Sequence, residues 1–196
     1  ILRHVTPVED ALKCHAVNCI FQRKGYNTDW LGFYNSLTSI NVEGPILLLG
    51  AGGVSRAILY ALCKMGHKEI HLCNRTVEKA LQVKEDFSKE CEIIVESFGD
   101  LKDVLKGVRT FINATSIGMF GELFDLNVDD ISHLSLVYDV VYNYTPLQEM
   151  AKEVGITCVD GKAFWYHQAV ENLKIWDVYE EKIFEECFEQ IVGAES

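Results

Sequence analysis

The stretch "PILLLGAGGVSRA", residues 45–57, decides the fold. Its apolar run is stopped by Gly50, which is typical of a short strand that is buried on both faces. Apolar side chains then recur at helical spacing, so we expect a helix over 54–65. A glycine-rich turn between a strand and a helix is the context of a dinucleotide-binding fingerprint, with Gly50 at the turn and Gly52 facing a diphosphate. Ser55 replaces the third glycine of that fingerprint, and a plain tight turn is the alternative.

Strand-like and helical segments alternate from this stretch as far as residue 161. Further strands are expected at 69–75, 92–98, 110–115, 134–142 and 157–161, and further helices at 77–89, 101–106 and 146–154. Strands that alternate with helices form βαβ units, and right-handed crossovers place helices on both faces of a parallel sheet. The sequence therefore predicts an α/β fold with a doubly wound, Rossmann-like sheet.

The segments at the two ends fall outside this unit. A short helix and a strand are expected before residue 22, a helix over 30–40, and two helices from 163 onward. We expect these end segments to pack on each other or on a domain that lies outside the chain. Because the chain begins with Ile1, not Met, and inside a helix-like segment, we also expect that an N-terminal part is missing.

Composition narrows the class of function. A formal net charge of −11 argues against a nucleic-acid-binding surface or a polybasic membrane patch. The seven cysteines form no C-x-x-C pair and no zinc-ligand spacing, so no metal site is expected. Unpaired cysteines, with no signal peptide and no long apolar span, predict a cytoplasmic protein. The sequence leaves a monomer and a homodimer both open.

The end of the second strand of the sheet bears on the cofactor. NAD-specific sites usually carry a carboxylate there, whereas this chain has "NRT" at 74–76. Asn74 has no charge that would repel a 2′-phosphate, and Arg75 offers a planar, permanently charged fork that suits a phosphate. The pattern favours NADP over NAD. The alternative is that Arg75 only caps a sheet edge in solvent.

Ligands of such folds bind beyond the carboxyl ends of the strands, where three polar stretches of this chain fall. Thr115 and Ser116 are expected either to face the nicotinamide end of the cofactor or to bond within their own turn. Tyr142 and Gln168 are placed at the same crevice, and Gly161 permits a close backbone approach. Each of these three also suits an ordinary packed, solvated or turn position.

The stretch "GYNTDW", residues 25–30, leads into the helix expected over 30–40. Thr28 or Asp29 can cap that helix by accepting hydrogen bonds from its first free N–H groups, and the local pattern favours a cap. The alternative is that Asp29 faces a substrate while Thr28 caps. The local residues leave both interpretations open.

Seven blocks of the sequence, in order and spacing, resemble the shikimate dehydrogenase family over essentially the whole chain. They are "AVNC" at 16–19, "GYNTD" at 25–29, "GAGGVSRA" at 50–57, "NRT" at 74–76, "INATSIGM" at 112–119, "VYDVVYNYTPL" at 137–147 and "DGKAFWYHQA" at 160–169. The resemblance implies the end of an N-terminal α/β substrate domain at 1–28, most of which is missing, and a connecting helix at 29–43. It implies a Rossmann-like NADP-binding domain at 44–162 and C-terminal helices at 163–196 that pack back toward the N-terminal domain, with the active site in the cleft between the two domains. It also implies reversible, NADPH-dependent reduction of 3-dehydroshikimate to shikimate, on the way to chorismate and the aromatic amino acids.

The resemblance also implies site residues by motif position. The substrate ligands are expected to be Asn18, Asp29, Tyr142 and Gln168, with Thr28 beside them. The cofactor contacts expected from the motifs and from the strand ends are Glu9, Gly50, Ala51, Gly52, Gly53, Val54, Asn74, Arg75, Thr76, Val77, Glu78, Lys79, Thr115, Ser116, Val140 and Gly161.

One part of the family pattern has no counterpart in these residues. The catalytic lysine and the Ser-x-Ser motif of the family do not occur in this chain, so we expect Asp29 to be one half of a catalytic Lys–Asp pair whose lysine lies outside it. With an ordinary pKa of about 4, Asp29 would be ionised at pH 7 and would anchor groups rather than donate a proton. A quinate/shikimate dehydrogenase and a non-catalytic NADP-binding fragment stay open as alternatives.

Overall fold

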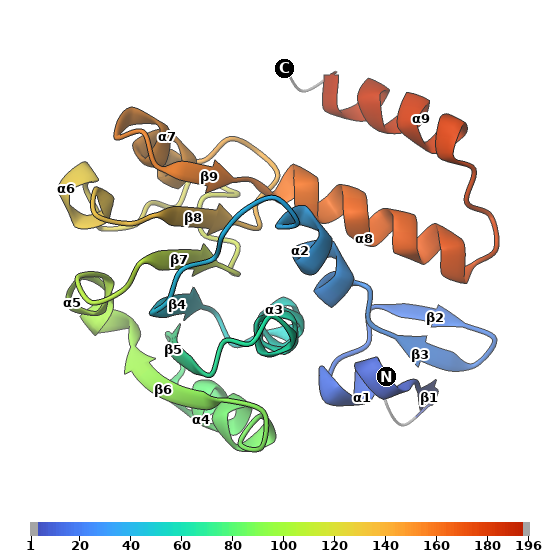
Figure 1. The fold of residues 1–196 in the computed structure, drawn as a ribbon, viewed down its shortest axis with the longest axis horizontal. Helices are drawn as coiled ribbons and strands as arrows, with labels where there is room; N and C mark the ends of the chain where they lie inside the picture. The colour runs from blue at the N-terminus through green and yellow to red at the C-terminus, as the bar shows by residue number, and fades with distance from the viewer. Residues whose placement is uncertain (1–3, 194–196) are drawn as a thin grey trace.

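A six-stranded sheet forms the centre of the molecule, and all of its neighbouring strands are parallel (Figure 1). The computed structural model describes residues 4–193 and confirms the doubly wound α/β fold. The strand order is β6-β5-β4-β7-β8-β9. The bounds are β4 (Ile46–Leu49), β5 (Glu69–Asn74), β6 (Glu92–Ser97), β7 (Thr110–Asn113), β8 (Leu136–Asp139) and β9 (Thr157–Val159).

Strand β4 shows why helices cover both faces of this sheet. All four of its side chains are buried, and alternate side chains of a strand point to opposite faces. Ile46 and Leu48 belong to one hydrophobic cluster, and Leu47 and Leu49 to another. The helices of the first cluster are α2 (Asp29–Ser36), α3 (Gly53–Lys64), α4 (Val77–Asp86) and α8 (Gly161–Ile175), and those of the second are α5 (Leu101–Leu105), α6 (Val128–Ile131) and α7 (Pro146–Glu153).

A second, small sheet lies beside the N-terminal end of α2 (Figure 1). Its order is β1-β3-β2, with β1 parallel and β2 antiparallel to the central strand. The elements of this region are β1 (Thr6–Pro7), α1 (Glu9–Lys13), β2 (Cys19–Phe21) and β3 (Lys24–Tyr26). The remaining elements are η1 (Phe98–Asp100) and α9 (Glu181–Gly193), which runs alongside α8.

Helices α2 and α8 cross closely because Gly32 has no side chain. A Cβ atom on Gly32 would lie 2.8 Å from Cβ of Gln168 and 2.9 Å from the carbonyl oxygen of Phe164. Real Cβ atoms do not approach other atoms this closely, so a larger residue would push the helices apart. The crossing brings Asp29, the first residue of α2, next to Gln168 at the edge of one cavity.

Several predicted elements are longer than the observed ones, and two of them show the physical reason. The strand expected over 134–142 ends at Asp139, because that buried carboxylate turns the chain by accepting hydrogen bonds from the Val141 amide at 3.2 Å and the Thr145 hydroxyl at 2.6 Å. The helix expected over 30–40 ends at Ser36, whose hydroxyl bonds back to the Phe33 carbonyl at 2.8 Å. Within the described residues 4–193, no helix is both long and apolar enough to cross a membrane.

Candidate active site

The glycine turn after β4 has the geometry of a phosphate-binding loop. Gly50 has φ of +113°, and a Cβ atom there would lie 2.9 Å from both the Ala114 carbonyl oxygen and the Ser55 hydroxyl oxygen. Gly50 is therefore required by its conformation and by its neighbours. At Gly52 and Gly53 a Cβ atom would meet nothing within 4 Å. This open side of the loop, at the N-terminus of α3, fits the diphosphate of a dinucleotide.

The end of β5 lies against this turn. The Gly50 amide donates to the Cys73 carbonyl at 2.8 Å, and Asn74 Nδ2 donates to the Thr76 carbonyl at 2.8 Å. Arg75 is exposed between them and forms no ion pair within residues 4–193. Arg75 follows two residues after Cys73, which contacts the glycine turn. Its guanidinium therefore fits the 2′-phosphate of a dinucleotide whose diphosphate lies at that turn.

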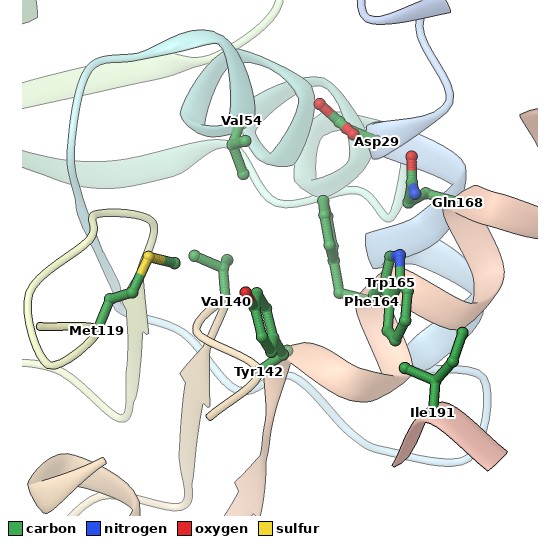
Figure 2. Close-up of a pocket in the computed structure, with 10 residues that line it drawn as sticks. Asp29, Val54, Met119, Val140, Tyr142, Phe164, Trp165, Gln168 and Ile191 are labelled. Atoms are coloured by element: carbon green, nitrogen blue, oxygen red, sulfur yellow. The ribbon is translucent and has the colours of Figure 1, made fainter. Parts of the chain in front are cut away.

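A cavity of about 590 Å³ brings the predicted substrate and cofactor residues together (Figure 2). Its lining residues are Asp29, Val54, Met119, Val140, Tyr142, Gly161, Phe164, Trp165, Gln168 and Ile191. Figure 2 shows Asp29 and Gln168 near each other, and Val54, Val140 and Tyr142 across the ring of Phe164 from them. Three of the four predicted substrate ligands and three of the predicted cofactor contacts therefore share one cavity.

Asp29 is held in this cavity by the fourth predicted substrate ligand. Asn18 Nδ2 donates to Asp29 Oδ1 at 2.6 Å and to the Thr28 hydroxyl at 2.9 Å. Burial raises the pKa of Asp29 to about 6, while the hydrogen bond from Asn18 lowers it. The ordinary pKa of about 4 that we expected is therefore wrong for this carboxyl. At pH 7 Asp29 is still mostly ionised, with roughly one molecule in ten protonated.

The helix-cap interpretation of Thr28 is wrong. The side chain of Thr28, the N-cap residue of α2, accepts no hydrogen bond from the helix; the Trp30 amide instead donates to Asn27 Oδ1 at 3.3 Å. The Thr28 hydroxyl donates to Asn172 Oδ1 on α8 at 2.9 Å. Asn27 therefore caps the helix, and Thr28 links the start of α2 to α8.

Residues 50–53 and 74–79 lie outside the cavity lining, on the glycine turn and from the end of β5 onward, and three further predicted cofactor contacts lie outside the lining as well. Thr115 bonds within its own turn: its hydroxyl lies 2.7 Å from Asn113 Oδ1 and accepts a hydrogen bond from the Ile117 amide at 3.1 Å. Ser116 is exposed. Glu9 is exposed and forms an ion pair with Lys13 at 2.6 Å. Cofactor contact by these residues stays a prediction.

Comparison with known proteins decides the family. A family model described as Shikimate / quinate 5-dehydrogenase matches residues 37–120. Shikimate dehydrogenase (NADP(+)) of Thermotoga maritima is 43% identical over 193 residues, which make up 98% of this chain and 74% of that protein. This chain belongs to the shikimate dehydrogenase family.

Solved structures of shikimate dehydrogenases share the fold described above. The crystal structure of shikimate dehydrogenase from T. maritima matches with a TM-score of 0.89 and 42% identity, over 97% of this chain and 74% of that one. Shikimate 5-dehydrogenase from Thermus thermophilus, in complex with NADP(H) and shikimate, matches with a TM-score of 0.79 and 27% identity, over 96% of this chain and 74% of that one. The chain thus spans about three quarters of the length of these shikimate dehydrogenases.

The cavity of this family member also contains residues that sequence reasoning missed. Met119, Phe164, Trp165 and Ile191 line it. Apolar side chains carry no chemical signal in a single sequence, because the same residues at the same spacing suit an ordinary core. Met119 stands in the family block at 112–119 and Phe164 and Trp165 in the block at 160–169, whereas Ile191 lies outside every block.

The raised pKa of Asp29 predicts that this residue lowers the free energy of unfolding at neutral pH. Between its unfolded pKa of 3.8 and its folded pKa of about 6, the native state binds a proton that the unfolded state does not. The contribution of Asp29 to the free energy of unfolding therefore falls as pH rises from about 4 to about 6. Asp29→Asn, which keeps an oxygen for Asn18, is expected to be more stable than wild type by about 2 kcal/mol at pH 7, allowing for partial exposure.

Urea unfolding at a series of pH values checks this expectation. The difference between variant and wild type should be near zero at pH 4 and reach its full size by pH 7. The exposed Asp103→Asn serves as control, because Asp103 pairs with Lys106 and its pKa is lowered rather than raised. A constant difference across this pH range would contradict the assignment of the raised pKa to Asp29.

Proposed function

We propose that this protein catalyses the reversible, NADP-dependent interconversion of 3-dehydroshikimate and shikimate, in the biosynthesis of chorismate and the aromatic amino acids, and that it does so in the cytoplasm. One observation carries the proposal. The cavity of about 590 Å³ joins Asp29, Tyr142 and Gln168 to the edge of the glycine loop and to Val140 and Gly161. The relatives named shikimate dehydrogenase (NADP(+)) support the choice of substrate and cofactor.

The residues that would hold NADP lie along one edge of the sheet. We assign residues 50–54 to the diphosphate, residues 74–79 to the adenosine 2′-phosphate, and Val140 and Gly161 to the nicotinamide end. NADPH, when bound, supplies the hydride that reduces the carbonyl carbon. The open faces of Gly52 and Gly53 and the unpaired Arg75 support these assignments.

The residues that would hold shikimate present complementary polar groups to its hydroxyls. Asp29 Oδ1 accepts from Asn18, and within residues 4–193 no hydrogen bond uses Asp29 Oδ2. That oxygen is available to accept a hydrogen bond from a substrate hydroxyl. The Tyr142 hydroxyl and the Gln168 amide lie in the same cavity. The apolar side chains around these groups lower the local dielectric constant, which strengthens each of these hydrogen bonds.

The role of Asp29 in proton transfer follows from its charge. A carboxylate that is mostly ionised at pH 7 can orient and stabilise an ammonium group, and no lysine is among the residues that line the cavity in the described part of the chain. We propose that Asp29 pairs with a lysine supplied from outside these 196 residues, and that this lysine gives the proton to the carbonyl oxygen. In this proposal residues 1–28 belong to a substrate domain and residues 44–162 to the NADP domain.

A two-form assay tests the function. One form is the 196-residue chain; the other, the extended chain, is this chain fused to the part of the T. maritima relative that the match leaves uncovered. We expect NADP reduction by shikimate with the extended chain and none with the shorter form alone. Turnover by both forms would support the function but overturn the outside lysine. Turnover by neither, with NADP bound, would overturn the function. Parallel assays with quinate in place of shikimate, and with NAD in place of NADP, show whether the site is specific for its substrate and its cofactor.

Loss of the Arg75 guanidinium tests the NADP assignment. Arg75→Ala is expected to weaken NADPH binding about tenfold or more and to leave NADH binding unchanged, because only NADPH carries the 2′-phosphate that pairs with the charge. Calorimetric titration of the 196-residue chain measures both affinities. Lys152→Ala, which removes an exposed cation on α7, is the control. Equal losses for NADPH and NADH would contradict the assignment.

A further inference from the structure

A chain of hydrogen-bonded side chains runs from Asn18 through Thr28 and Asn172 to Gln168. Asn172 lies one turn beyond Gln168 on α8, so the two side chains share a helix face. Asn172 Nδ2 donates to Gln168 Oε1 at 3.1 Å, and the Thr28 hydroxyl donates to Asn172 Oδ1 at 2.9 Å. Neither the motif blocks nor the cavity lining includes Asn172.

The direction of every hydrogen bond in this chain is determined at its start. The backbone N–H of Thr28 can only donate, and it donates to Asn18 Oδ1 at 2.8 Å. Asn18 therefore turns its Nδ2 toward the Thr28 hydroxyl oxygen, at 2.9 Å. Because the Thr28 oxygen accepts that bond, its single proton goes to Asn172 Oδ1 at 2.9 Å, which is nearer than the other acceptor within reach, Gln168 Oε1 at 3.5 Å. The amide of Asn172 must then present Nδ2 to Gln168.

The last link determines which end of the Gln168 amide faces the cavity. With Oε1 directed to Asn172, the Nε2 group remains, and within residues 4–193 no hydrogen bond uses it. Figure 2 shows the nitrogen of Gln168 on the side of Trp165 and the oxygen turned away from that ring. The cavity wall thus offers a donor at Gln168 beside the acceptor of Asp29.

We propose that Asn172 is a positioning residue: it holds the Gln168 amide with its N–H groups toward the substrate, so that Gln168 and Asp29 together bind a hydroxyl as donor and acceptor. This inference rests on the proposed function of the cavity. A hydroxyl that donates to Asp29 Oδ2 can accept from Gln168 Nε2 at the same time. A flipped Gln168 would place two acceptors side by side and leave one of them without a proton.

Asn172→Asp is the variant that separates the orientation of the Gln168 amide from the packing of the side chain at position 172. The carboxylate has the shape of the amide and can still accept from Thr28, but it cannot donate to Gln168 Oε1. Gln168 is then expected to flip and donate Nε2 to the introduced carboxylate. Asn41→Asp makes the same chemical change and the same change in charge at an exposed loop position, so it is the matched control.

Neutron diffraction from crystals of the deuterated 196-residue chain reads the orientation directly, without activity. The expected result is two deuterons on the Gln168 atom that faces the cavity in wild type, and on the atom that faces residue 172 in Asn172→Asp. Deuterons toward Asn172 in wild type, or an unflipped amide in the variant, would overturn the proposal. This readout is independent of whether shikimate is the substrate.

Kinetics of the extended chain tests the consequence for binding. Asn172→Asp is expected to raise KM for shikimate about tenfold or more with a smaller change in kcat, and to have no further effect in a Gln168→Leu background. A purely structural role would lower activity by the same factor in both backgrounds, and that result would overturn the proposal. If Asn172→Asp unfolds, Asn172→Leu, which also lacks the donor, is measured in the same two backgrounds.

Discussion

Asp29→Asn in the extended chain is expected to lower kcat/KM for shikimate about a thousandfold, within the range that acid–base groups contribute. The substituted amide keeps an oxygen for Asn18, whose Nδ2 lies 2.6 Å from Asp29 Oδ1 in wild type. It loses the negative charge that would hold an ammonium group and orient the substrate hydroxyl. Initial rates of NADP reduction measure the effect.

The same substitution should make the protein more stable at pH 7, because the charge of Asp29 is partly buried and its pKa is raised to about 6. A loss of activity together with a gain in stability is typical of a group that is kept for function. Asp103→Asn, an exposed change, should alter neither quantity. Wild-type kcat/KM in Asp29→Asn would show that Asp29 has no part in the reaction.

Gly161→Ala is expected to destabilise the protein by about 3 kcal/mol or more, at the upper end of overpacking effects. A Cβ atom at Gly161 would overlap the Val140 carbonyl oxygen and would lie 2.7 Å from the Tyr142 amide nitrogen. These are backbone atoms, so no side-chain rotation relieves the contact. The loop from 140 to 142 must move, and displacement of reacting groups by about 1 Å can cost a hundredfold in rate.

Denaturant unfolding and initial rates check this expectation together. Gly99→Ala is the matched control, since a Cβ atom there would lie 3.7 Å from its nearest neighbour, the Ser97 hydroxyl oxygen, at an ordinary contact distance. The control should keep both stability and activity within experimental error. A Gly161→Ala protein with wild-type stability would mean that Val140 and Gly161 do not pack as described.

The doubly wound sheet could be predicted from residues 45–57 and the alternation that follows, because local apolar pattern and glycine position decide strand and helix. Lengths of elements could not be predicted where a buried side chain intervenes. The long strand expected to end at Tyr142 stops at Asp139, whose carboxylate bonds the loop amide of Val141. As a result Tyr142 reaches the cavity from a loop rather than from a strand end.

The sequence could predict only those residues of the site that lie in recognisable motifs. Asp29, Tyr142 and Gln168 stand in family blocks, and the cavity joins them. Thr28 is of a residue type that commonly caps helices. Only its hydrogen bond to Asn172 shows that it links α2 to α8 instead. The pKa of Asp29 could not be predicted either, because it depends on burial that the packing of α2 against α8 creates.

In the proposed function, NADP and shikimate meet in the cavity between the glycine loop and the crossing of α2 with α8. A crystal structure of the extended chain with NADP⁺ and shikimate tests it most directly. We expect the nicotinamide and shikimate in this cavity, with the diphosphate at residues 50–54 and a shikimate hydroxyl bonded to both Asp29 and Gln168. Either ligand outside the cavity, or shikimate bound without contact to Asp29, would contradict it.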